Sequence, residues 1–173
     1  EEPEKKRYAD YMSSNVLQRL HCGDVSTSNG VIAFSFGDSD DVNQLLAKEV
    51  ERFHQENPLA PCYVQQEVAA HLKATPHVSI ENNAYQTTTD VARSALNDIG
   101  LAKITVIAQS WHAQRCIETC ESLGFEVVAL RVSDGFPAKD PQPWVRNPIN
   151  WIIKESHREV ATGYEISEQF NLV

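Results

Sequence analysis

The segment "QSWHAQR", from Gln109 to Arg115, combines side chains that could do chemistry. A histidine can exchange a proton near neutral pH, and an arginine can bind a carboxylate or phosphate through two parallel hydrogen bonds. His112 also falls at the expected start of a helix, where free backbone amides and the helix dipole favour an anionic group. We therefore predict that His112 is a catalytic or hydrogen-bonding residue. The ligand-binding residues predicted beside it are Gln109, Ser110 and Arg115.

A second polar segment, "ENNAYQTTTD", begins with Glu81 and ends with Asp90. Glu81 closes an expected strand, and a carboxylate in such a position can orient a hydroxyl group or take up a proton. We predict that Glu81 is a second catalytic residue and that Thr87 and Asp90 bind the ligand. The alternative for Thr87 is that it caps the helix that starts there and has no role in binding.

A third segment, "VIAFSFGDSDD", runs from an apolar stretch into Gly37 and Asp38. We predict that Gly37 lies beside the ligand and that Asp38 binds a ribose-like hydroxyl, an amine or a cation. Gly37-Asp38-Ser39 also resembles the nucleophile block of the GDSL-type lipases and esterases. However, no Asp-x-x-His occurs near the C-terminus, and Asn97-Asp98 lies at an expected helix end. Because the base and the oxyanion donor of such a hydrolase are missing, we do not expect Ser39 to be a nucleophile.

Two groups of residues offer metal-ligating atoms, and neither forms a strong pattern. The first, His112 with Cys116 and Cys120, spreads over two turns of one expected helix, a spacing that rarely converges on one ion. The second offers oxygen ligands that suit magnesium or calcium: Asp38, Asp40 and Glu81. Acidic residues are equally typical of helix N-termini, so we predict no metal site.

Five runs rich in β-branched residues alternate with helical patterns along the chain. These runs are Val31–Phe36, Ala60–Gln65, His77–Glu81, Ile104–Gln109 and Glu126–Val132. Several are almost continuously apolar, which is typical of strands buried on both faces of a parallel sheet. The alternation predicts an α/β fold, namely a Rossmann-like, doubly wound, mainly parallel five-stranded sheet with helices on both faces.

The 173 residues suit a single domain with a core of residues 31–132 and an addition at each end. The spacing of apolar residues within residues 1–22 predicts an amphipathic helix. Residues 133–173 predict a loop long enough to form a lid, followed by a C-terminal helix or helix pair that starts or is interrupted near Pro148. Trp144 and Trp151 are expected to pack this helix onto the sheet. Since open parallel sheets bind ligands outside the carboxyl ends of their strands, we expect the three polar segments to meet in one cleft.

The composition restricts the class of partner. A formal net charge of −9 without a basic stripe argues against nucleic acid. No apolar run approaches the ~20 residues of a membrane span, and no Gly-x-Gly-x-x-Gly or P-loop motif occurs. The four cysteines lack disulfide-framework spacing, and free thiols fit a reducing cytoplasm. We therefore expect a cytoplasmic protein with a small-molecule partner.

The chain resembles the bacterial YdcF/SanA/ElyC-like family over roughly Val31 to Val132. The segments that carry the resemblance are "VIAFSFG", "ENNAYQTTTDVA" and, most closely, "ITVIAQSWHAQRC" with Ser110, His112 and Arg115. The family pattern differs in having a second glycine beside Gly37, a Ser-Gly-Gly in place of Gln65-Gln66-Glu67, and asparagines in place of Gln86 and Asp90. The resemblance implies a Rossmann-like fold with a pocket at the strand carboxyl ends and a link to cell-envelope processes. It also implies S-adenosylmethionine as a ligand, because one soluble member of the family is associated with binding it.

Three functions are compatible with these patterns. The first is binding of a small, partly anionic or nucleotide-like ligand, with S-adenosylmethionine as the cofactor that the resemblance implies. The second is a hydrolase or transferase acting on a phosphate- or sugar-linked substrate with the help of a divalent ion. The third is a scaffold module without catalysis. No strong nucleophile–base pair is visible in the sequence, so the patterns do not decide between an enzyme and a binding protein.

Overall fold

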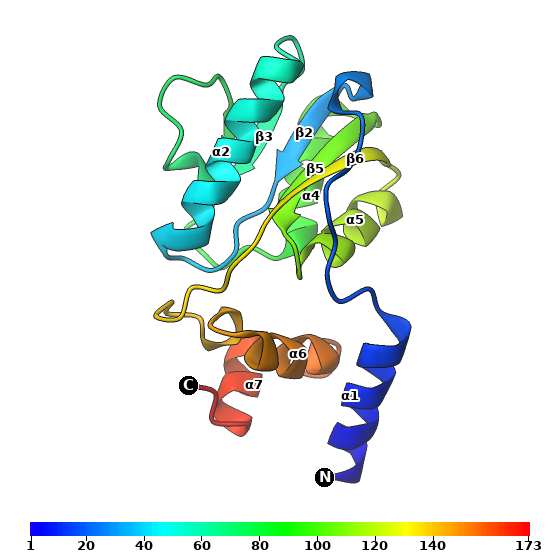
Figure 1. Ribbon diagram of the computed structural model, residues 1–173, viewed down its shortest axis with the longest axis vertical. Coiled ribbons are helices and arrows are strands. Elements are labelled where there is room, and N and C mark those ends of the chain that lie inside the picture. Colours follow the sequence, from blue (N-terminus) through cyan, green and yellow to red (C-terminus); the bar gives the residue numbers. More distant parts are fainter.

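The apolar runs of the chain form the strands of one sheet in the computed structural model, which describes all of residues 1–173 (Figure 1). The strands are β1 (Cys22–Gly23), β2 (Gly30–Ala33), β3 (Cys62–Gln65), β4 (Val78–Ile80), β5 (Lys103–Gln109) and β6 (Glu126–Ser133). Their order is β1-β6-β5-β2-β3-β4, and every pair is parallel except β1 with β6. The α/β fold and the mainly parallel sheet are confirmed, but the predicted count of five strands is wrong, because the sheet has six. The two residues of β1 are too few to leave an alternating pattern in the sequence.

Helices cover both faces of this sheet (Figure 1). They are α1 (Glu2–Ser14), α2 (Asp40–Glu56), α3 (Gln66–Ala69), α4 (Thr88–Ile99), α5 (Ala113–Ser122), α6 (Pro148–His157) and α7 (Gly163–Gln169), with two 3₁₀ turns, η1 (Val25–Thr27) and η2 (Pro143–Val145). On one face α2 packs over β2, β5 and β6, and on the other α4 and α5 pack over the same sheet. The five parallel strands have a doubly wound, Rossmann-like order, which reverses between β2 and β5.

Strand β2 shows why the runs are apolar at almost every position. Val31 and Ala33 belong to one apolar cluster, together with Leu46 of α2. Ile32 belongs to a second cluster on the opposite face, together with Val91 of α4. All five side chains are fully buried. Because both faces are covered, neither set of alternating positions tolerates a polar residue, and β2 leads directly from the core to the carboxyl edge of the sheet.

The N-terminal helix is shorter than the sequence predicts. It ends at Ser14, and Asn15 is already extended with φ −117° and ψ 150°. The hydroxyls of Ser13 and Ser14 donate to the backbone carbonyl of Asp10. Serine and asparagine compete with helical hydrogen bonding in this way, and three of them in succession end the helix. The prediction that the helix continues to residue 22 is therefore wrong, and Leu20 is 74% exposed.

Of the two predicted alternatives for the C-terminal segment, one helix or a pair, the structure has the pair, α6 and α7. Helix α6 begins at Pro148, and the side chain of Asn147 caps it by accepting a hydrogen bond from the amide of Asn150. Trp144 and Trp151 are each 2% exposed and pack into the apolar core, but Trp144 lies in η2 before the helix, so only Trp151 belongs to α6. In Figure 1, α6 and α7 lie beyond the carboxyl ends of the strands rather than on a face of the sheet. The C-terminal segment therefore covers the edge at which a parallel sheet binds its ligands.

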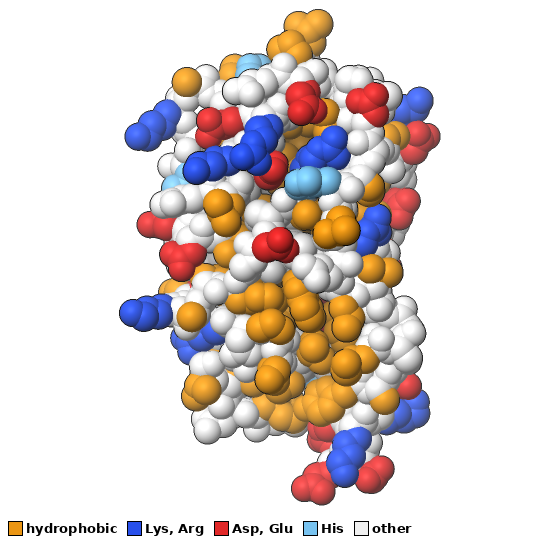
Figure 2. All heavy atoms as spheres, in the orientation of Figure 1, with side chains coloured by type: hydrophobic (Ala, Val, Ile, Leu, Met, Phe, Trp, Pro, Cys, Tyr) orange, Lys and Arg blue, Asp and Glu red, His pale blue; other side chains and the backbone are white.

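Apolar and charged side chains are unevenly distributed over the surface. Figure 2 shows that apolar side chains gather over α6 and α7, whereas charged ones are spread over the sheet region and the start of α1. Helix α6 contributes to both the interior and the surface, because Trp151 is buried while Ile149 is 70% exposed. None of the helices combines the length and the apolar character that crossing a bilayer requires.

Candidate functional site

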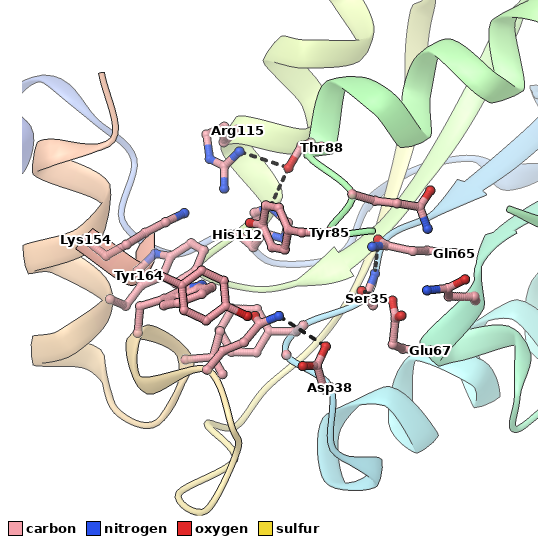
Figure 3. Close-up of a pocket in the computed structure, with 18 of the residues that line it drawn as sticks. Ser35, Asp38, Gln65, Glu67, Tyr85, Thr88, His112, Arg115, Lys154 and Tyr164 are labelled. Carbon is pink, nitrogen blue, oxygen red and sulfur yellow. Dashed lines mark hydrogen bonds between the residues drawn. The ribbon is translucent and has the colours of Figure 1, made fainter. Parts of the chain in front are cut away.

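A pocket of about 260 Å³ lies between the carboxyl ends of the strands and the C-terminal helices (Figure 3). Its position agrees with the rule that doubly wound sheets bind ligands near the reversal of strand order. Its side chains form a basic wall (Arg115, Lys154), an acidic wall (Asp38, Glu67) and an aromatic rim (Tyr85, Trp144, Tyr164).

The basic wall joins Arg115 of α5 to Lys154 of α6 through one carboxylate. Nε of Arg115 donates to Oε1 of Glu155 at 2.6 Å, and Nζ of Lys154 donates to Oε2 at 2.8 Å. The side chains of Lys154 and Glu155 are 8% and 3% exposed. Although burial disfavours the ionised form, the two cations hold the pKa of Glu155 well below its usual range. Burial lowers the pKa of Lys154, and the negative charge of Glu155 opposes that shift.

The basic wall carries more positive charge than the protein neutralises. Arg115 and Lys154 share Glu155, and neither makes a second ion pair. The ammonium of Lys154 also lies 5.2 Å from the ring of Trp151, which attracts a cation but supplies no negative charge. Buried charges in proteins are normally paired, so the excess charge indicates a place where an anionic group can bind.

His112 lies at the start of α5, against the basic wall and beside the rings of Phe36 and Trp151. Its Nε2 is 3.1 Å from Oγ1 of Thr88, which also accepts a hydrogen bond from Nη1 of Arg115 at 2.9 Å. Its Nδ1 is buried and has no hydrogen-bond partner. Burial lowers the pKa of His112 well below its usual value, and the charge of Arg115 lowers it further. At neutral pH the ring is therefore an uncharged imidazole.

The acidic wall joins the loop after β2 to α3. Nε2 of Gln142 donates to Oδ1 of Asp38 at 3.1 Å, and the hydroxyl of Ser35 donates to Oε1 of Glu67 at 3.0 Å. Both partners are neutral. Asp38 is exposed overall, but its partial burial still raises its pKa, and the negative charges of Asp140 and Glu67 raise it further. The acidic wall is thus a pair of carboxylates without a cationic partner in the protein.

The loop Gly37–Ser39 takes its shape from Asp140, which is fully buried. Oδ2 of Asp140 accepts hydrogen bonds from the amides of Asp38 and Ser39, at 2.9 and 2.8 Å, and from the hydroxyl of Ser39 at 2.7 Å. Gly37 has φ +73°, and a Cβ there would overlap this carboxylate. Ser39 therefore orders the loop, and its hydroxyl is bound to a carboxylate instead of a histidine, which agrees with the expectation that it is not a nucleophile.

The aromatic rim brings together rings from three separate elements. Tyr85 precedes α4, Trp144 lies in η2 and Tyr164 lies in α7. Their ring centroids are 6.4 Å apart for Tyr85 and Trp144, 6.3 Å for Tyr85 and Tyr164, and 4.9 Å for Trp144 and Tyr164. Both tyrosines are more than half exposed. Tyr85 and Tyr164 therefore present aromatic surface at the pocket to a planar or apolar part of a ligand, whereas Trp144 is buried and packs against both rings.

Four of the nine predicted site residues line this pocket: Gly37, Asp38, His112 and Arg115. Glu81 is exposed after β4 and is not part of the lining, so the structure does not bring it to His112. Thr87 and Asp90 form a capping box at the start of α4, with hydrogen bonds of 3.1 and 2.9 Å between their side chains and amides. The neighbouring Thr88 lines the pocket instead.

The two remaining predicted residues are buried but do not line the pocket. Oε1 of Gln109 accepts hydrogen bonds from the amides of Trp111 and His112, at 2.6 and 3.2 Å. The hydroxyl of Ser110 donates to Asp134 at 2.8 Å. Gln109 and Ser110 therefore fix the turn into α5, and through it the position of His112.

Sequence reasoning missed the C-terminal half of the site. Lys154 and Glu155 lie in the segment "WIIKESH", where a lysine next to a glutamate suggests an exposed pair. Asp140 lies in a loop rich in proline and aspartate, which is typical of a surface turn. The signal that could have indicated Lys154 is its position one helical turn after Trp151, on the apolar side of α6.

Histidine, cysteine and carboxylate side chains do not gather in groups of three or more that could hold a metal ion. Asp38, Asp40 and Glu81 accordingly do not form the oxygen-ligand site that their sequence positions allow. All four cysteines are free thiols, and Cys116 and Cys120 are buried in the core.

Comparisons with protein-family models, with curated proteins and with solved structures find no match to this chain.

Proposed function

We propose that this protein binds a small ligand through an anionic group at the basic wall. The observation that carries the proposal is the excess of buried positive charge, since Arg115 and Lys154 share the single carboxylate of Glu155. A carboxylate or phosphate of the ligand would supply the missing negative charge and accept the N–H groups that Glu155 leaves free. His112 and Thr88 would add uncharged hydrogen-bonding groups beside it.

The rest of the pocket suits a nucleotide-like ligand. The aromatic rim could stack against a base, and Asp38 could bind a hydroxyl or an amino group of the ligand. The resemblance of "ITVIAQSWHAQRC" to the YdcF/SanA/ElyC-like family suggests S-adenosylmethionine, which carries a carboxylate, a ribose and a base, as the first ligand to test. A role in cell-envelope processes rests on the same resemblance.

Isothermal titration with S-adenosylmethionine and with adenosine monophosphate tests the proposal. We expect at least one of them to bind wild-type protein, and to bind Lys154→Met at least about tenfold more weakly, because the variant loses the excess cation. Lys139→Met, which removes an exposed lysine outside the pocket, is the matched control and should bind like wild type. Absence of heat with both ligands, or equal affinity in Lys154→Met, would contradict the proposal.

A second candidate is a transferase or hydrolase for a phosphate- or sugar-linked substrate. The observation that favours it is the neutral imidazole of His112 beside two cations, since a neutral imidazole can accept a proton during attack on a bound phosphate. Release of p-nitrophenol from p-nitrophenyl phosphate, with and without magnesium, tests this candidate. Turnover that falls about a hundredfold or more in His112→Asn would support it, and turnover unchanged in that variant would exclude His112 as the base.

A further inference from the structure

The pocket has two walls of opposite charge, contributed by different elements. Figure 3 shows Arg115 and Lys154 on one side and Asp38 and Glu67 on the other, with His112 and Tyr85 drawn between them. The basic wall belongs to α5 and α6, whereas the acidic wall belongs to the loop after β2 and to α3. No ion pair joins the two walls, and the ion pairs of Arg115 and Lys154 are both with Glu155.

Neither carboxylate of the acidic wall is neutralised by the protein. Asp38 and Glu67 make no ion pair with any lysine, arginine or histidine, and their side-chain partners are the amide of Gln142 and the hydroxyl of Ser35. The fully buried Asp140, bonded by backbone amides of the same loop, adds a third negative charge behind Asp38. Like charges so close together raise each other's free energy, and a cation placed between them and the solvent would lower it.

From this arrangement we infer that the ligand is dipolar: it carries a cationic group, such as a primary ammonium, that binds the acidic wall, and a phosphate or carboxylate that binds the basic wall. The inference rests on the proposed function, because it assumes that the anionic group lies at Arg115 and Lys154. It goes further in assigning the acidic wall as a second subsite. A cation is favoured over a pair of hydroxyls at that subsite, since hydroxyl groups would bind Asp38 and Glu67 without reducing their negative charge.

Matched pairs of phosphate esters test the second subsite separately from the first. Phosphoethanolamine and ethyl phosphate share the anion and differ in the amine, and 3-aminopropyl phosphate and propyl phosphate repeat the comparison with a longer spacing. Affinities are measured by isothermal titration at up to about 20 mM ligand and by thermal shift, which reports binding to the folded state. We expect the amine-bearing member of at least one pair to bind wild-type protein about tenfold more tightly.

The double variant Asp38→Asn/Glu67→Gln should lose this preference for the amine and still bind ethyl phosphate or propyl phosphate. If the double variant does not fold, Asp38→Asn alone serves, since Asp38 is exposed and makes one side-chain hydrogen bond. The matched control Asp41→Asn/Glu51→Gln changes two exposed carboxylates of α2 outside the pocket and should keep the preference.

Equal binding of both members of both pairs to wild-type protein would overturn the dipolar ligand and leave the proposed anion site intact. Retention of the amine preference in the acidic-wall variant would also overturn the inference, because the cation would then bind elsewhere. Absence of binding by all four esters would overturn both the inference and the anion site on which it rests.

Discussion

At the scale of single residues, Glu155 is bound by two cations. We assign Arg115 to the stability of the fold and Lys154 to the binding of the ligand. A buried carboxylate needs one cationic partner, and Arg115 alone would provide it at 2.6 Å. Lys154 is the additional cation, and burying its ammonium carries a desolvation cost. A buried cation that shares its only carboxylate with another cation, and that faces a pocket, is typical of a binding site, where proteins accept a local cost for function.

This charge balance predicts very unequal changes in the free energy of unfolding for substitutions at two neighbouring residues. Lys154→Met leaves Arg115 and Glu155 as a one-to-one pair, so we expect the free energy of unfolding to change by no more than about 1 kcal/mol in either direction. Glu155→Gln leaves two buried cations without a carboxylate and should cost about 3–5 kcal/mol. Urea unfolding at pH 7 measures both, with Lys139→Met as the exposed control. Equal losses in the two variants would show that Lys154 is a structural partner of Glu155.

At the scale of elements, the loop from β2 to α2 depends on a residue that is distant in the sequence. Oδ2 of Asp140 accepts three hydrogen bonds from Asp38 and Ser39, and Oδ1 accepts one from the amide of Gln142. The loop therefore keeps its place in the pocket only while the segment after β6 is docked against it.

Asp140→Ala should consequently disturb both the fold and the pocket. It removes the acceptor of four buried or part-buried donors, and at about 1–3 kcal/mol for each unsatisfied group we expect a loss of at least about 3 kcal/mol in the free energy of unfolding. Asp41→Ala, which removes an exposed acidic side chain from the first turn of α2, should cost less than about 1 kcal/mol. Thermal and urea unfolding of the two variants provide the measurement. Losses of similar size would mean that solvent can replace Asp140.

The same distinction between local and distant contacts explains which elements the sequence predicts. The run Val31–Phe36 and the helix that starts at Thr88 follow from periodicity and capping, which neighbouring residues determine. The cluster of His112 and Arg115 at a strand end follows from the topology of parallel sheets. Lys154 could not be predicted with confidence from its own segment, because its burial depends on where α6 docks. The prediction that Glu81 joins the site depends on its strand end alone, and the structure leaves this residue exposed.

At the scale of the whole molecule, the C-terminal segment covers the carboxyl edge of the sheet and completes the pocket there. Trp144 and Trp151 anchor this segment in the same apolar cluster as Val31 of β2 and Leu46 of α2. The pocket is thus built from the α/β region and the C-terminal segment together. Separating the two would expose Trp144 and Trp151 to solvent. Ionisable groups enclosed in this way couple the stability of the entire fold to pH.

His112 and Glu155 should divide the pH dependence of unfolding into two windows. Burial and Arg115 hold the pKa of His112 below the 6.5 of the unfolded chain, so below pH 6.5 the unfolded state binds a proton that the folded state excludes. Stability should therefore fall as the pH drops from 6.5 to about 5, by up to about 2 kcal/mol. Glu155, whose pKa is depressed from 4.5, contributes stability that is lost only below about pH 4.5.

The variant His112→Phe tests this assignment, because phenylalanine fits among Phe36 and Trp151 and cannot take up a proton. Urea unfolding of both proteins from pH 7 down to about pH 3.5 should show the loss between pH 6.5 and 5 in wild type and a smaller loss in the variant. The decline below pH 4.5 should persist in both proteins, since Glu155 is unchanged. If His112→Phe loses as much stability as wild type between pH 7 and 5, then another group causes the acid sensitivity, and His112 is not the neutral imidazole on which a catalytic role would depend.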